Sequence, residues 1–100
     1  MTPEDVAAHA SGLPRCKRKG TASRPAWYVD DRLVVRLEDA TTLTVRSTFE
    51  ARERLLAEHP ETFGVPPAME RHLKVQVVLD HGNDDAIREA ISAAYELQRR

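Results

Sequence analysis

Cysteine, glycine and long apolar runs are all scarce in this sequence. Cys16 is the single cysteine among 100 residues, so no internal disulfide can form and a reducing compartment is expected. Glycine occurs only singly, at positions 12, 20, 64 and 82, which excludes a Gly-rich phosphate-binding loop. No apolar stretch approaches the length of a membrane span, and Glu4 and Asp5 stand where a secretory signal would be apolar. We therefore expect a cytoplasmic protein that does not contact membranes.

Residue patterns for catalysis or metal binding are also missing. The histidines are scattered along the chain: His9, His59, His72 and His81. None has a His or Cys neighbour at ligand spacing, which argues against a zinc site. Cys16 has no identifiable base or oxyanion hole to make it a nucleophile, and Ser47 has the context of a helix cap. The sequence therefore predicts a protein that is not an enzyme and needs no metal or cofactor.

The composition is that of an ordinary folded domain. Hydrophobic residues make up 41% of the chain and charged residues 31%, and 100 residues suffice for one hydrophobic core but not for two. We expect a single domain over residues 1–100. The formal net charge is only −1, so any binding of an anionic partner must come from a local concentration of positive charge.

Hydrophobic periodicity predicts three helices and at least four strands. Apolar residues at helical spacing, with capping and terminating residues, indicate helices over 2–12, over 47–60 and from residue 83 or 84 onward. Alternation with a period of two indicates strands over 26–29, 32–37, 42–46 and 72–79. The Pro- and Gly-containing stretch 61–70 is expected to be a loop.

The helix boundaries follow from particular residues. Thr2 with Asp5, and Ser47 with Glu50, have the spacing of capping boxes. Gly12 is expected to close the first helix in the left-handed conformation. The last helix is expected to start from a cap at 83 or 84 and to bury residues at positions i, i+4, i+7 and i+8: Ile87, Ile91, Ala94 and Tyr95.

The alternation also assigns the strand residues to two faces. The face expected to be buried holds Trp27, Val29, Leu33, Val35, Leu37, Leu43, Val45, Leu73, Val75, Val77 and Leu79. The opposite face is expected to hold Ala26, Tyr28, Val34, Arg36, Thr42, Thr44, Arg46, Lys74, Gln76 and Val78. Strands that are apolar on one face only, together with amphipathic helices, predict an α+β two-layer sandwich with a mainly antiparallel sheet and helices on one face.

Positive charge collects on the face that no helix is expected to cover. Its polar residues include cations but no carboxylate, and the basic segment 15–24 would extend it if that segment pairs at the sheet edge. The candidate nucleic-acid-binding residues are Arg15, Lys17, Arg18, Lys19, Arg24, Arg36, Arg46 and Lys74. The same residues also suit a solvated sheet face whose charges oppose aggregation.

Two functions are compatible with this pattern. The first is a DNA-binding module that contacts phosphates and is largely independent of base sequence. The second is a protein-interaction or regulatory domain without nucleic-acid binding, which would use the sheet face or the Pro-rich loop at 65–67. An apolar patch around Val34, Val65 and Val78 would favour the second.

The order of several short motifs resembles the MmcQ/YjbR family of small bacterial proteins. The matching stretches are "RPAWYVDDRLVVRL", "LLAEHPETF" and "LKVQVVLD…IREAISAAYELQ", which together span nearly the whole chain. The resemblance implies a frataxin-like, or double-wing, α+β fold and supplies no catalytic residues. Members of this family are commonly labelled DNA-binding, largely by analogy of fold. The sequence departs from the family pattern at Asp30-Asp31, where a Gly-containing turn is usual, and at Leu73, where an aromatic residue is common.

Overall fold

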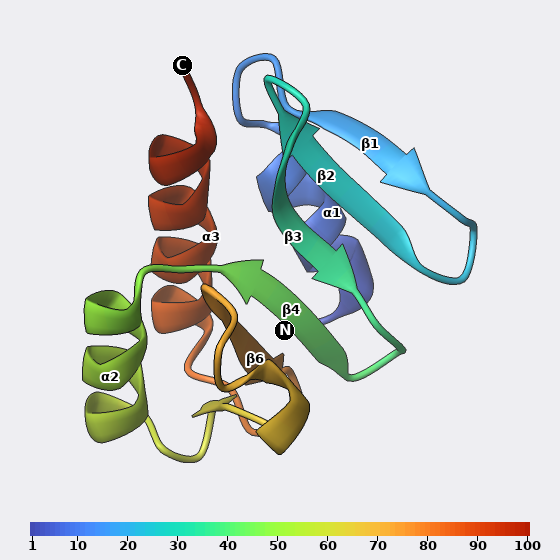
Figure 1. Cartoon of the computed structure of the whole chain (residues 1–100). Coiled ribbons are helices and arrows are strands. Elements are labelled where there is room, and N and C mark those ends of the chain that lie inside the picture. The colour runs from blue at the N-terminus through green and yellow to red at the C-terminus, as the bar shows by residue number, and fades with distance from the viewer.

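The computed structural model describes all residues from 1 to 100 as three α-helices, six strands and a short 3₁₀ turn (Figure 1). In chain order the elements are α1 (Pro3–Ser11), β1 (Lys17–Gly20), β2 (Pro25–Val29), β3 (Arg32–Leu37), β4 (Thr42–Arg46), α2 (Phe49–Glu58), β5 (Phe63–Gly64), η1 (Pro67–Met69), β6 (Lys74–Val78) and α3 (Asp84–Gln98). None of the helices combines the length and the apolar character needed to cross a membrane.

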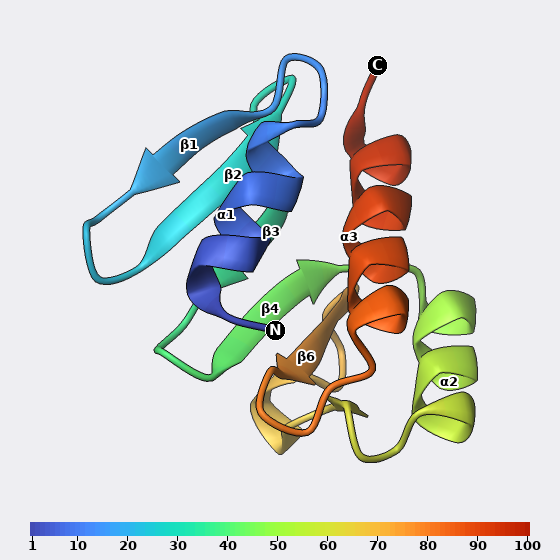
Figure 2. The same cartoon turned by 180° about the vertical axis from the view of Figure 1, so that it is seen from behind.

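All six strands form one antiparallel sheet in the order β1-β2-β3-β4-β6-β5. Helix α1 lies behind the strands in Figure 1 and in front of them when the molecule is turned round in Figure 2. Helix α3 packs on β3 and β4, and α2 stands beside the β5–β6 end of the sheet. The expected α+β architecture with an antiparallel sheet is confirmed. The family resemblance implies the first strand and turn of the sheet within residues 15–24, and β1 lies there. Only β5 is outside the expected set, because it falls in the expected loop.

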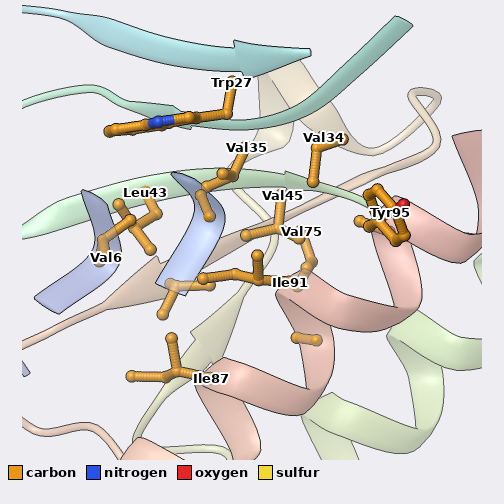
Figure 3. Packing of buried hydrophobic residues seen from close by; sticks show 14 of the residues in the cluster. Val6, Trp27, Val34, Val35, Leu43, Val45, Val75, Ile87, Ile91 and Tyr95 are labelled. Atoms are coloured by element: carbon orange, nitrogen blue, oxygen red, sulfur yellow. The ribbon is translucent and has the colours of Figure 1, made fainter. Parts of the chain in front are cut away.

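The core fills the space between the sheet and helices α1 and α3 (Figure 3). Trp27 is 1% exposed, and its indole N–H donates to Ser11 Oγ at 3.1 Å. The ring is therefore buried while its one polar group keeps a hydrogen-bond partner. The four apolar residues expected to define the buried face of α3 are all in the core: Ile87, Ile91, Ala94 and Tyr95. The Tyr95 hydroxyl donates to the carbonyl of Pro14 at 2.9 Å and fastens the turn after α1 to this helix.

A β-bulge in β3 interrupts the expected alternation of inward and outward residues. Trp27 pairs with Val35 and Tyr28 pairs with Leu33, so Val34 has no partner residue on β2. Val34 and Val35 are both fully buried, and Figure 3 shows Val34 beside Tyr95 of α3. Leu33 is only partly buried and shares the outer face with Tyr28. The expectation of Leu33 in and Val34 out is therefore wrong, because one extra residue shifts the alternation.

Three further local expectations need correction. The N-cap of α2 is Thr48, whose hydroxyl accepts from Ala51 N–H at 3.1 Å, whereas Ser47 donates to the Thr48 carbonyl. Gly12 has φ −78° and does not adopt the left-handed conformation. Leu73 precedes β6 and is 37% exposed, so it is not a core residue. The capping box of Thr2 and Asp5 is confirmed, and Asn83 is the cap of α3.

The β2–β3 turn is built from two residues with left-handed backbone. Asp30 has φ 50° and Asp31 has φ 62°, a conformation that two-residue hairpins require and that glycine adopts without a steric cost. Asp30 is held in place because its carboxylate accepts from the backbone N–H of Arg100 at 2.7 Å and lies 3.5 Å from Arg15. Asp31 has only an exposed ion pair with Lys19. The strain at Asp31 is thus compensated by one weak contact.

Replacing Asp31 by glycine should stabilise the protein. Relief of the left-handed conformation outweighs the lost surface ion pair and the greater freedom of glycine in the unfolded chain, for a gain of about 0.5–1 kcal/mol. Urea unfolding of wild type and Asp31→Gly measures this difference. Asp30→Gly is the matched control and should be destabilised, since it loses the bond to the Arg100 backbone. Lower stability of Asp31→Gly would contradict this account of the turn.

Candidate nucleic-acid interface

The outer face of the sheet carries a row of cations along its central strands. Arg36 pairs in register with Thr44 on β4, and Arg46 on β4 pairs with Lys74 on β6, so their side chains share the face that α1 and α3 leave open. Arg36 and Lys74 make no side-chain hydrogen bond or ion pair, and both are partly exposed. Arg46 is engaged differently, because its Nη1 donates to the carbonyl of Leu73 at 2.7 Å.

Strand β1 divides its three cations between the two faces. Lys17 pairs with Tyr28 and Lys19 pairs with Ala26, which places both on the outer face, and Lys17 has no ionic partner. Arg18 pairs with Trp27, and its guanidinium lies 5.6 Å from the centre of that inward-facing ring. The residue type and the charge run do not distinguish Arg18 from its neighbours; only the strand pairing does.

The two remaining candidates are tied to carboxylates. Arg15 is 61% exposed and lies 3.5 Å from Asp30, and Arg24 is paired with Glu38. The eight candidate cations therefore fall into three groups. Lys17, Lys19, Arg36 and Lys74 point outward with at most an exposed partner. The second group, Arg15, Arg24 and Arg46, is engaged within the protein, and Arg18 lies on the other face.

Glu38 places a carboxylate on the face that was expected to have none. One oxygen accepts from Arg24 and the other from Thr44 Oγ1 at 2.8 Å, although Thr44 is only 4% exposed. Burial raises the pKa of Glu38, but the bonds from Arg24 and Thr44 and the charges of Arg24 and Arg36 outweigh it. The pKa is therefore below the ordinary value of 4.5. Glu38 is ionised at neutral pH and neutralises Arg24.

A buried arginine holds the segment that leads into Lys74. Arg52 on α2 is 7% exposed, and its guanidinium donates to four backbone carbonyls of residues 69–74: Met69 at 3.4 Å, Glu70 at 3.0 Å, His72 at 2.9 Å and Lys74 at 3.3 Å. The flat guanidinium also lies 4.8 Å from the centre of the Phe49 ring. Sequence reasoning missed Arg52, because a charged residue in a polar helix gives no signal of burial.

Cys16 does not have the environment of a reactive thiol. It is partly buried against the core, and burial raises the pKa of its thiol. No group of three or more His, Cys, Asp or Glu side chains is arranged to hold a metal ion.

A cleft lies on the helical side of the molecule. It has a volume of about 410 Å³ and lies between α2 and α3, with Val45, Val75 and Leu55 among its apolar walls. A second hollow of about 320 Å³ lies at the β1 edge of the outer face. Five of its six lining residues are charged, and Arg15, Lys17 and Lys19 contribute three cations.

The architecture is thus an α+β sandwich with one helix-covered face and one open face. No protein-family model and no curated protein matches the sequence. Among solved structures, the fold is similar to that of Deinococcus radiodurans protein DR2400, a DUF419 domain. The match has a TM-score of 0.80, 19% sequence identity, and coverage of 96% of this chain and 77% of that chain. At this identity the likeness establishes the fold.

The ionic bond of Glu38 should make part of the stability depend on pH. Because its pKa is lower in the folded state, its charge contributes stability above about pH 4.5, and this contribution is lost as the pH falls through the folded-state pKa. We expect wild type to be more stable than Glu38→Gln at pH 7 and the difference to shrink from about pH 5 to about pH 3. Urea titrations over that range test this, and an unchanging difference would contradict it. Glu70→Gln, which alters an exposed carboxylate, is the control.

Removing the Arg52 guanidinium should destabilise the fold. Arg52→Met keeps the apolar stem but leaves four carbonyl groups without their donor, and we expect a loss of about 3 kcal/mol in the free energy of unfolding. The control Arg54→Met changes an exposed neighbour on the same helix and should alter stability by less than about 0.5 kcal/mol. Equal effects of the two variants in urea unfolding would overturn the assigned role.

Proposed function

We propose that this protein is a non-enzymatic module that binds nucleic acid through the phosphate backbone. The observation that carries the proposal is the position of four cations, Lys17, Lys19, Arg36 and Lys74, on one sheet face that α1 and α3 leave open. Three of them make no ion pair, so a phosphate need not compete with an internal carboxylate for them. The formal net charge of −1 then coexists with a locally basic surface.

Contacts of this kind position a nucleic acid without reading its sequence. Lys and Arg donate readily to phosphate oxygens, whereas sequence readout requires an element that enters a groove and reaches the base edges. The four cations span β1 to β6, nearly the whole width of the sheet. We propose DNA as the partner because the resembled family is labelled DNA-binding, and the phosphate contacts lead us to expect little preference for base sequence.

Membership of the MmcQ/YjbR family is also part of the proposal. It is supported by the order of the sequence motifs and by the fold shared with a DUF419 domain, a group related to that family. The left-handed Asp30-Asp31 pair fills the place of the Gly-containing turn usual in the family. Family membership agrees with a DNA-binding label but adds no site residue.

A protein-interaction domain is the second candidate function. The apolar cleft between α2 and α3 favours it, as do the exposed Leu97 at 40% and Phe49 at 45%. The apolar patch around Val34, Val65 and Val78 that would also favour it is incomplete, because Val34 is fully buried. The polar, cationic character of the outer face is better suited to an anionic polymer.

The proposed function is tested by measuring binding to a labelled DNA duplex, with fluorescence anisotropy as the readout, at several salt concentrations. Four phosphate contacts predict a log–log salt slope of about −4. Lys17→Gln should weaken binding several-fold and reduce the slope by about 1, because one phosphate contact is lost.

Arg18→Gln is a matched control for this prediction. It removes the same charge from the adjacent position of β1, but its side chain lies over Trp27 on the other face. Its effect should be clearly smaller than that of Lys17→Gln. Absence of binding by wild type at low salt, or equal effects of the two variants, would reject the sheet face as the interface and favour the protein-interaction function.

A further inference from the structure

The hollow at the β1 edge combines cations with an aromatic ring. It has a volume of about 320 Å³ and is lined by Arg15, Lys17, Lys19, Tyr28, Asp30 and Asp31. Tyr28 faces outward from β2 between Lys17 on β1 and Leu33 on β3, and it is partly exposed. It is the only aromatic side chain among the outward-facing residues of the paired strands, since Trp27 and Phe63 are buried in the core.

The charged side chains that line the hollow do not fully neutralise one another, so an anion could bind there. Three cationic and two carboxylate side chains give a net charge of +1. The Asp30 carboxylate accepts a hydrogen bond from the backbone N–H of Arg100. The Lys17 ammonium group makes no hydrogen bond or ion pair. The Lys19–Asp31 pair has an N–O distance of 3.1 Å, but Asp31 is 93% exposed, so the pair is weak and easily exchanged.

Lys19 lies over the Tyr28 ring. Its ammonium group lies 5.3 Å from the centre of the Tyr28 ring, a cation–π contact made by a side chain that is itself 48% exposed. A flat apolar group stacking on Tyr28 would displace this ammonium toward any phosphate attached to the same ligand. A nucleotide has both parts, a planar base and a phosphate, linked at short range.

We propose that this hollow holds one unpaired nucleotide, with the base stacked on Tyr28 and the adjoining phosphate between Lys17 and Lys19. The proposal rests on the proposed function and deepens it, because it names single-stranded nucleic acid as the preferred partner over a closed duplex. Stacking on an aromatic side chain beside a basic track is the common way in which proteins bind single strands without reading sequence. The bases of a duplex are not available to Tyr28.

The test compares two labelled probes at one salt concentration, a 12-nucleotide oligo-dT and a hairpin-closed duplex without free ends. We expect Tyr28→Leu to weaken binding of oligo-dT about ten-fold and of the closed duplex less than about two-fold. Tyr28→Phe keeps the ring and should bind oligo-dT as wild type does. Circular dichroism of each variant checks that it is folded.

A second variant tests the hollow without changing Tyr28. Asp31→Asn removes the carboxylate that competes for Lys19 and should tighten oligo-dT binding about three-fold. Asp85→Asn is the control, since Asp85 is also 93% exposed and ion-paired but lies on α3. This pair of variants decides the matter if Tyr28→Leu does not fold.

The two proposals fail in different ways. If wild type binds neither probe, the proposed function itself is wrong. If wild type binds both probes and Tyr28→Leu weakens both equally or neither, nucleic-acid binding stands and the nucleotide site in the hollow is rejected. An unchanged affinity of Asp31→Asn for oligo-dT would count against the site in the same way.

Discussion

Burial of one face of the sheet beneath α1 and α3 is the interaction on which the rest of the structure depends. It draws Trp27, Val35, Val45 and Ile91 into a single core and leaves the opposite face without a helix to cover it. Because apolar side chains are used on the covered side, the open side must be polar to remain solvated. The polar character of the open face therefore follows from where the helices pack, and its positive charge comes from the particular residues Lys17, Lys19, Arg36 and Lys74.

Polar contacts then determine which cations remain available on the open face. Glu38 engages Arg24, Leu73 O accepts from Arg46, and the residue 69–74 segment is fixed by Arg52. Of the eight candidate cations, only Lys17, Lys19, Arg36 and Lys74 therefore remain on the open face with at most an exposed ionic partner. The internal partners hold Arg24 and Arg46 within the protein, and the cations without such a partner are free to contact a ligand.

The sequence was sufficient for features that depend on periodicity and local capping. It predicted the buried face of α3, the core position of Trp27 and the capping box at Thr2, because each follows from spacing along one element. It could not predict the bulge at Val34, since one unpaired residue depends on how two strands align. The position of Arg18 over Trp27 and the burial of Arg52 could not be predicted for a related reason, because neighbours distant in sequence create both environments.

The most direct test of the central claim is an NMR titration of the isotopically labelled protein with a short single-stranded oligonucleotide, followed through its backbone amide signals. The account predicts shift changes concentrated at Lys17, Lys19, Tyr28 and Arg36 on the open face, with little change along α2 and α3. Changes confined to the α2–α3 cleft, or no changes at low salt, would contradict it.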